Sequence, residues 1–180
     1  MAGRAEKYLP PMLKGYTEKT MAWLHNNLDG PWEHNEPGVD YFLALSGVQI
    51  EVKNTDKTGA LTDKITPRQS KQLDAYGGFI FLVMWEKDYP NLPGGADAYL
   101  VPWKVYKAFW DNKPARKAYR RRVTAYAVGV EDVLGQYKLP WAGGTWKIPK
   151  NHPSLFWTEV SSRIDLARSL TRMYLDSLED

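Results

Sequence analysis

The sequence predicts an α/β protein in which a mixed central β-sheet is flanked by helices. Two short apolar runs on either side of Ser46-Gly47 are typical of a β-hairpin, and residues 79–85 form a continuous apolar run of strand length. Helical patterns come before, between and after these runs, so we expect helices on both faces of the sheet. With 180 residues, of which 43% are hydrophobic and 25% charged, the chain suits a single domain (1–180) with a sizeable core.

The first predicted elements are a helix and a hairpin. Apolar residues at helical spacing predict an amphipathic helix over 17–28, with Thr17 as its N-cap. The hairpin is expected to pair strands 41–45 and 48–50 through the two-residue turn Ser46-Gly47.

The next elements have clear boundaries. Residues 54–66 are polar and predict an exposed loop, after which Thr66 is the N-cap of a helix that ends at Gly77-Gly78. The run 79–85 predicts a strand covered on both faces, and 98–101 predicts another strand. Further helices are expected at 103–110, near 130–134 and at 155–178.

Composition excludes several classes of function. The chain has no cysteine, which excludes a disulfide scaffold, thiolate catalysis and most structural zinc sites. There is neither an apolar run as long as a membrane span nor a signal-peptide core, so we expect a cytoplasmic protein without a membrane partner. The net charge of +3 barely argues for nucleic acid by itself.

The hairpin carries an unusual group of charged residues. A two-residue turn places Asp40 opposite Lys53 and makes Glu51 the diagonal neighbour of Asp40. Because side chains alternate along a strand, these three side chains share one face. A hairpin that only builds a core has no reason to collect two acids and a lysine there, whereas a metal-dependent phosphodiesterase does.

These residue types suit hydrolysis of a phosphodiester. Mg²⁺ prefers hard oxygen ligands and retains waters, and a bound metal can activate water and neutralise phosphate charge. Asp40 and Glu51 would be the ligands, with the backbone carbonyl of Val52 as a third oxygen, and Mn²⁺ is expected to substitute for Mg²⁺. Lys53 would hold the attacking water or stabilise the phosphate charge.

A simpler interpretation stays open. Asp40 and Lys53 would then be a cross-strand ion pair, with Glu51 solvated on an exposed face. The triplet Glu51-Val52-Lys53 alone is a very weak motif, and the preceding acid makes it moderately specific.

Gly38-Val39-Asp40 followed by Gln49-Ile50-Glu51-Val52-Lys53 resembles the core of the PD-(D/E)XK nuclease superfamily, with Val39 where the proline often stands. The segment 14–18, Lys-Gly-Tyr-Thr-Glu, is similar to the start of the archaeal-type Holliday junction resolvases, and this likeness implies that Glu18 reaches the metal site. Pro67-Arg68-Gln69 resembles the glutamine segment of the RecU-type resolvases, which a Gly-Gly pair and an apolar strand also follow. The likeness covers about 14–110, and the extension 111–180 resembles no family.

The resemblance implies a restriction-endonuclease-like core with an extra C-terminal helix, and a Holliday junction resolvase that nicks two strands as a homodimer on branched DNA. The residues to which it assigns catalysis are Asp40, Glu51, Lys53, Glu18 and Gln69, with Glu18 also a metal ligand. Glu6 is a weaker substitute for Glu18, and Gln72 lies on a similar helix face to Gln69. Basic residues expected to contact DNA phosphates are Lys57, Lys64, Arg68, Arg116, Lys117, Arg120, Arg121 and Arg122.

Other functions remain open at this point. The same core serves sequence-specific restriction-like and repair endonucleases, and a non-catalytic DNA-binding module is a third alternative. The basic run 113–122 is either a DNA contact or a solvated helix face, and the apolar stripe of the C-terminal helix is either core or dimer interface.

Overall fold

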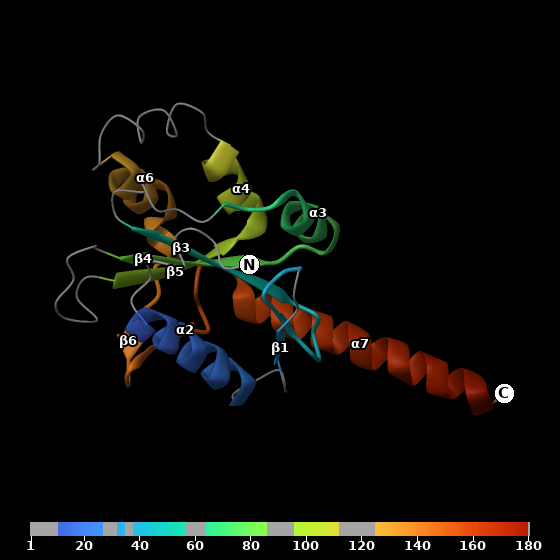
Figure 1. The fold of residues 1–180 in the computed structure, drawn as a ribbon. Coiled ribbons are helices and arrows are strands. Elements are labelled where there is room, and N and C mark those ends of the chain that lie inside the picture. The colour runs from blue at the N-terminus through green and yellow to red at the C-terminus, as the bar shows by residue number, and fades with distance from the viewer. Residues whose placement is uncertain are drawn as a thin grey trace.

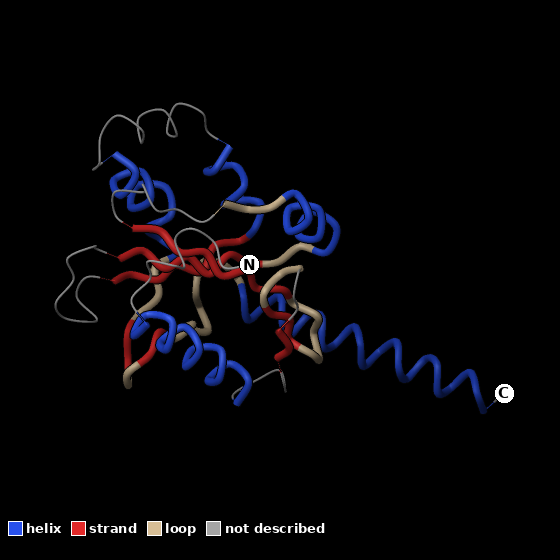
Figure 2. The backbone as a smooth tube through the Cα atoms, viewed as in Figure 1, coloured by secondary structure: helices blue, strands red, loops and turns tan. Residues whose placement is uncertain are grey.

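The computed structural model describes residues 11–26, 32–34, 38–56, 64–85, 96–111 and 125–179 of the chain. It has the mixed α/β architecture that the sequence predicts. In the described residues its main sheet has five strands in the order β1-β2-β3-β4-β5, in which β3 and β4 pair in parallel and the other neighbours pair antiparallel. Figure 2 shows these strands between helices that lie above and below them. The strands of this sheet are β1 (Trp32–His34), β2 (Tyr41–Leu43), β3 (Gln49–Asp56), β4 (Phe79–Trp85) and β5 (Ala96–Pro102).

Helices cover both faces of this sheet (Figure 1). On one face lie α3 (Pro67–Tyr76), α4 (Trp103–Asp111) and α6 (Ala125–Leu134), which the short 3₁₀ helix η2 (Gly135–Tyr137) follows. The other face is covered by α2 (Pro11–Leu24), by a two-stranded sheet of β6 (Trp141–Ala142) and β7 (Thr145–Trp146), and by the start of α7 (Phe156–Glu179). Within the described residues, no helix combines the length and the hydrophobicity that a membrane crossing requires.

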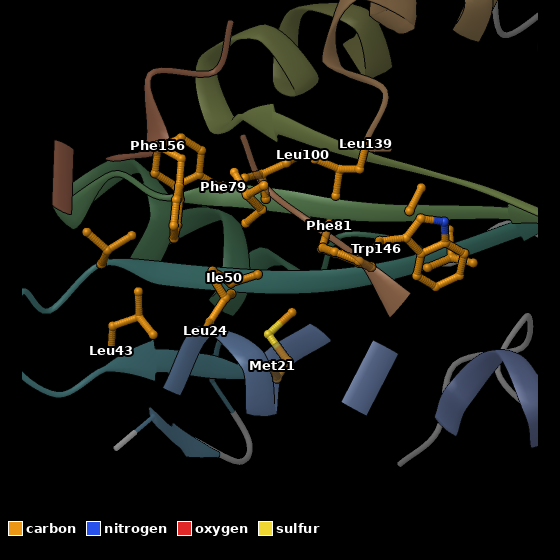
Figure 3. Close-up of a cluster of buried hydrophobic side chains, with 14 of the residues drawn as sticks. Met21, Leu24, Leu43, Ile50, Phe79, Phe81, Leu100, Leu139, Trp146 and Phe156 are labelled. Atoms are coloured by element: carbon orange, nitrogen blue, oxygen red, sulfur yellow. The ribbon is translucent and has the colours of Figure 1, made fainter. Parts of the chain in front are cut away.

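Strand β4, which lies between β3 and β5 in the sheet, separates two hydrophobic clusters. All seven of its residues are buried, as expected for a strand covered on both faces. Phe79 and Phe81 point into the cluster shared with Met21 and Leu24 of α2 (Figure 3). The alternate residues of β4 pack with α3, α4 and α6 on the opposite face. Burial on both faces therefore fixes β4 in the middle of the fold.

Local signals set the boundaries of α3 as the sequence predicts. The Thr66 hydroxyl accepts a hydrogen bond from the Gln69 N–H (3.2 Å), while the Gln69 side chain accepts one from the Thr66 N–H (3.1 Å). This reciprocal pair is a capping box. At the other end, Gly77 has a φ of 70°, and its N–H donates to the Leu73 carbonyl.

The predicted hairpin turn was wrong. Leu43 rather than Leu45 pairs with Val48, because residues 44–47 form a four-residue loop in which the Leu43 N–H donates to the Val48 carbonyl (2.9 Å). The observed pairs are Tyr41 with Ile50 and Phe42 with Gln49. The register has therefore moved by two residues, which leaves every side chain on its predicted face because the side-chain period of a strand is two.

Two predicted boundaries were also wrong. Residue 17 does not begin the first helix, since α2 starts at Pro11 and Thr17 is buried inside it. The neighbouring Thr20 hydroxyl lies 2.7 Å from the Thr145 hydroxyl, a long-range contact that holds this face of α2 against β7. The predicted loop 54–66 begins too early, because β3 continues to Asp56 and buries Thr55 beside β4.

Candidate active site

Hydrogen bonds hold Asp40 and Glu51 next to each other at the end of the hairpin. The Asp40 N–H donates to Glu51 Oε2, and the Val52 N–H donates to Asp40 Oδ2, both at 2.8 Å. Continuing the β2–β3 register places Asp40 opposite Glu51, rather than opposite Lys53 as the two-residue turn implied. The two acids are therefore direct neighbours, closer together than the sequence predicted.

The other oxygen of Glu51 meets two donors. Lys53 Nζ lies 3.0 Å from Glu51 Oε1, and Gln69 Nε2 donates to the same oxygen at 2.8 Å. The side chains of Glu51 and Lys53 are only 2% and 7% exposed, so this ion pair is buried. Glu51 is not a solvated residue on an exposed face, which removes that part of the simpler interpretation.

Three oxygens surround the Lys53 ammonium: Glu51 Oε1 at 3.0 Å, Gln69 Oε1 at 3.1 Å and the Lys64 carbonyl at 3.1 Å. An ammonium has three N–H donors, so this arrangement satisfies all of them. The lysine is held in place from β3, from α3 and from the segment just before α3.

Gln69 joins helix capping to the charged cluster. Its Oε1 accepts from both the Thr66 N–H and Lys53, which leaves its Nε2 directed at Glu51. The sequence left Gln69 and Gln72 as alternatives, and the structure separates them. Gln72 donates to the side chain of Gln49 instead.

Burial sets the charge state of Glu51. It raises the pKa of this carboxyl from 4.5 to about 7, against the lowering effect of Lys53 and with a further rise from the neighbouring Asp40. A carboxyl with this pKa is partly protonated at neutral pH. A cation close to both acids would favour the ionised form.

The residues present fit the divalent metal that the nuclease resemblance implies. Asp40 and Glu51 supply carboxylate oxygens, and the Val52 carbonyl lies on the strand edge that faces Asp40, because the N–H of the same residue bonds to Asp40. Among the described residues no group of three or more His, Cys, Asp or Glu is placed to hold a metal. Two carboxylates and a carbonyl suit Mg²⁺, which keeps several of its waters.

Glu18 lies apart from this cluster. It is exposed on α2, whose Met21 and Leu24 pack on the sheet face that carries Ile50. Side chains alternate along β3, so Glu51 and Lys53 project from the opposite face, toward α3. The structure therefore does not bring Glu18 to the other four predicted catalytic residues. Its alternative Glu6 lies outside the described residues.

Two of the predicted DNA-contacting residues border the cluster. Lys64 is exposed while its carbonyl binds Lys53, and Arg68 is exposed beside Gln69. The remaining predicted contacts lie outside the described residues; they are Lys57, Arg116, Lys117, Arg120, Arg121 and Arg122.

A groove of about 630 Å³ lies elsewhere, along α7 and the tip of the β2–β3 loop, and no residue of the cluster lines it. His152 is also part of the structural core, since it is buried between the Ser154 hydroxyl (2.7 Å) and the Tyr137 carbonyl (3.0 Å). Neither feature belongs to the candidate active site.

Comparisons of this chain with protein-family models, with curated proteins and with solved structures gave no match. The site therefore rests on its own geometry. One of its partners, the Lys64 carbonyl, was missed by sequence reasoning, because a backbone acceptor carries no signal in residue type.

Proposed function

We propose that this chain is a metal-dependent endodeoxyribonuclease that hydrolyses phosphodiester bonds, with a four-way DNA junction as its preferred substrate. The observation that carries the proposal is the direct pairing of Asp40 with Glu51, with Lys53 and Gln69 both bound to Glu51 Oε1. Mg²⁺ bound by the two acids and the Val52 carbonyl would supply an activated water and neutralise phosphate charge.

Each protein group has a defined part in this proposal. Asp40 presents its oxygens from the residue just before β2 and Glu51 from β3, and the hydrogen bonds to backbone N–H groups hold them in place. Lys53 brings a positive charge beside the acids, where it stabilises negative charge on the phosphate or orients the attacking water. Gln69 keeps the Glu51 carboxylate and the Lys53 ammonium in a fixed relative position.

The arrangement of elements supports the resemblance to the PD-(D/E)XK core. An α-helix, a hairpin that bears the acids, a parallel βαβ unit through α3 and a further antiparallel strand follow one another between residues 11 and 102. The exposed Lys64 and Arg68 give the rim of the cluster a positive charge for backbone phosphates. Action on a junction as a homodimer belongs to the same proposal.

The test is cleavage of labelled DNA by the full chain with Mg²⁺ and separately with Mn²⁺. The substrates are a synthetic four-way junction and matched linear duplex, splayed-arm and flap controls. We expect paired nicks in the junction and little cutting of the duplex. Sequence-dependent cutting of plain duplex would instead indicate a restriction-like or repair endonuclease. Binding without cutting in either metal would contradict the enzymatic proposal and favour a DNA-binding module.

A further inference from the structure

The second half of α7 carries an apolar stripe that no described residue buries. Phe156, Trp157 and Val160 anchor the start of this helix in the core. From Asp165 onward every described residue of α7 is exposed, and the helix extends away from the body of the protein (Figure 1). At 1.5 Å per residue this free segment is about 22 Å long.

The stripe continues the pattern that packs into the core. Val160, Ile164, Ala167, Thr171, Tyr174 and Leu178 follow one another at alternating spacings of four and three residues. That is the heptad pattern of helices that pack side by side. Tyr174 and Leu178 of the stripe are 63% and 64% exposed, and Leu170 and Leu175, which flank it, are 56% and 54% exposed. A stripe of this kind on a single free helix indicates a missing partner helix.

We propose that this segment pairs in antiparallel orientation with the same segment of a second copy of the chain. The sizes of the side chains favour this occupant. In an antiparallel pair with Thr171 facing the second copy's Tyr174, Ala167 faces the second copy's Leu178, so each large side chain meets a small one. A parallel pair would instead set small residues against small and large against large.

The charges beside the stripe agree with the same orientation. Arg168 and Glu179 border the stripe on the same side of the helix. The antiparallel register brings Arg168 of one copy to within one helical turn of Glu179 of the other. Because the contact is two-fold symmetric, this pair of opposite charges occurs two times. The polar side of the helix carries three acids and two arginines between residues 165 and 179, whereas a helix that lies on a membrane has a polar face rich in Lys and Arg.

A groove runs along one side of the free segment and adjoins the stripe. Its volume is about 630 Å³, and its lining extends from Leu45 of the β2–β3 loop and Ile164 to Glu179 at the end of α7. In the proposed register the second copy's Leu178 lies against Ala167, at this groove. The stripe and the groove form one continuous surface.

The proposed function already includes a homodimer, and this inference adds the surface and the orientation through which the two copies meet; it is argued from α7 alone, so it stands or falls separately from the nuclease activity. A single pair of short helices gives an interface below about 1,200 Å² in total, so we expect a weak dimer. The first experiment is sedimentation velocity of the full chain from about 2 to about 200 µM, where a monomer–dimer equilibrium of this strength is visible. Tyr174→Asp should weaken association by about tenfold or more, because it sets a carboxylate against the apolar stripe.

Ser169→Asp is the matched control, because Ser169 is exposed on the opposite side of the same segment. This variant adds the same charge and should associate as the wild type does. A chain that stays monomeric over the whole concentration range overturns the proposal. The proposal is also overturned if Tyr174→Asp dimerises as strongly as the wild type, since the interface would then lie elsewhere.

The second experiment tests the orientation and uses the fact that the chain has no cysteine. We expect Ala167→Cys mixed with Leu178→Cys to give a disulfide-linked dimer under mild oxidation, because the two sites face each other. Neither variant alone should cross-link in this way, since its two sulfurs would lie more than about 10 Å apart. Cross-linking of each single variant with itself would indicate a parallel pair and contradict the proposal.

Discussion

The two parallel strands β3 and β4 lie side by side in register, yet they are built from different residues. Glu51 pairs with Ile80, and Lys53 pairs with Leu82. All four are buried, and all four project from the same face of the sheet. Strand β4 places apolar side chains there, while β3 places a carboxylate and an ammonium at equal depth.

This difference has an energetic consequence. A buried ion pair loses hydration that its own attraction barely repays, and apolar residues of similar volume often stabilise a protein as well or better. Ile80 and Leu82 follow that rule. The presence of the buried pair Glu51 and Lys53 beside them is what we expect of a strand that carries a functional site.

The largest expected effect is on DNA cleavage, which should depend on the charged residues at β3 and not on the apolar residues of β4. We predict that Asp40→Asn lowers junction cleavage by about 1,000-fold or more, because it removes one of the two anionic oxygen donors proposed for the metal. The asparagine oxygen can still accept from the Val52 N–H, so the fold and junction binding should be retained. Single-turnover cleavage with Mg²⁺ and a binding assay on the same junction measure the two effects.

Two controls sharpen this prediction. Asp74→Asn removes one negative charge from α3, where Asp74 binds Trp103 and Lys107 away from the cluster, and should leave cleavage unchanged. Ile80→Val in β4 should lower the free energy of unfolding by about 1 kcal/mol and also leave cleavage unchanged. Equal loss of cleavage in Asp40→Asn and Asp74→Asn would argue against a catalytic role for Asp40.

The second effect concerns stability. We predict that Lys53→Met destabilises the protein by about 3–5 kcal/mol at pH 8, because it leaves the Glu51 carboxylate buried without its partner. Adding Glu51→Gln should restore much of this loss. Leu82→Ala, at the matching position in β4, should cost about 2–5 kcal/mol at every pH, since the loss is one of packing. Denaturant unfolding of the wild type, Lys53→Met, Glu51→Gln, the double variant and Leu82→Ala measures these values, and strict additivity of the two β3 changes would contradict the coupling.

The sequence predicts best those parts of the fold that local signals determine. The boundaries of α3 follow from Thr66 at the N-cap and Gly77 at the C-cap, and the burial of β4 follows from its unbroken apolar run. The start of α2 could not be predicted in this way. Thr17 has the residue type of an N-cap, but the contact between Thr20 and Thr145 is made across 125 residues.

The alternation of side chains along a strand was enough to predict part of the candidate site. Alternation placed Asp40, Glu51 and Lys53 on one face of the sheet. The predicted turn was wrong, but this face assignment still held because the register error was an even number of residues. The position of Glu18 could not be inferred from its spacing, since the packing of α2 decides which face of the sheet the helix covers. The Lys64 carbonyl was also beyond prediction, because it depends on how the chain enters α3.

A third prediction uses the pKa of Glu51. This pKa is raised to about 7 in the folded chain, so the folded state holds a proton that the unfolded state has already released between pH 4.5 and 7. The proton on Glu51 therefore stabilises the folded state in full below pH 4.5, and this stabilisation is lost as the pH rises through about 7. The free energy of unfolding should change by about 3 kcal/mol over this range. Glu51→Gln should remove this part of the pH dependence of unfolding, whereas Ile80→Val should lower the whole curve evenly.

Stabilisation by a bound metal should have the opposite pH dependence, because the metal binds the ionised form of Glu51. Since Mg²⁺ favours the ionised carboxylates, its stabilising effect on the wild type should be greater at pH 8 than at pH 5. Thermal unfolding with and without Mg²⁺ measures this difference. Equal stabilisation at both pH values, or equal stabilisation of Glu51→Gln, would place the metal away from Glu51.

The smallest expected effect lies in the helix that supports β3. Thr66→Ala removes the hydroxyl that caps Gln69 and should cost about 1 kcal/mol of stability. Because Gln69 also holds Glu51 and Lys53, cleavage should fall by more than this loss of folded protein explains. Thr66→Ser keeps the oxygen and should retain both properties. If Thr66→Ala loses stability but its folded fraction cleaves at the full rate, then the capping box supports only the helix, and β3 holds its charged pair without help from α3.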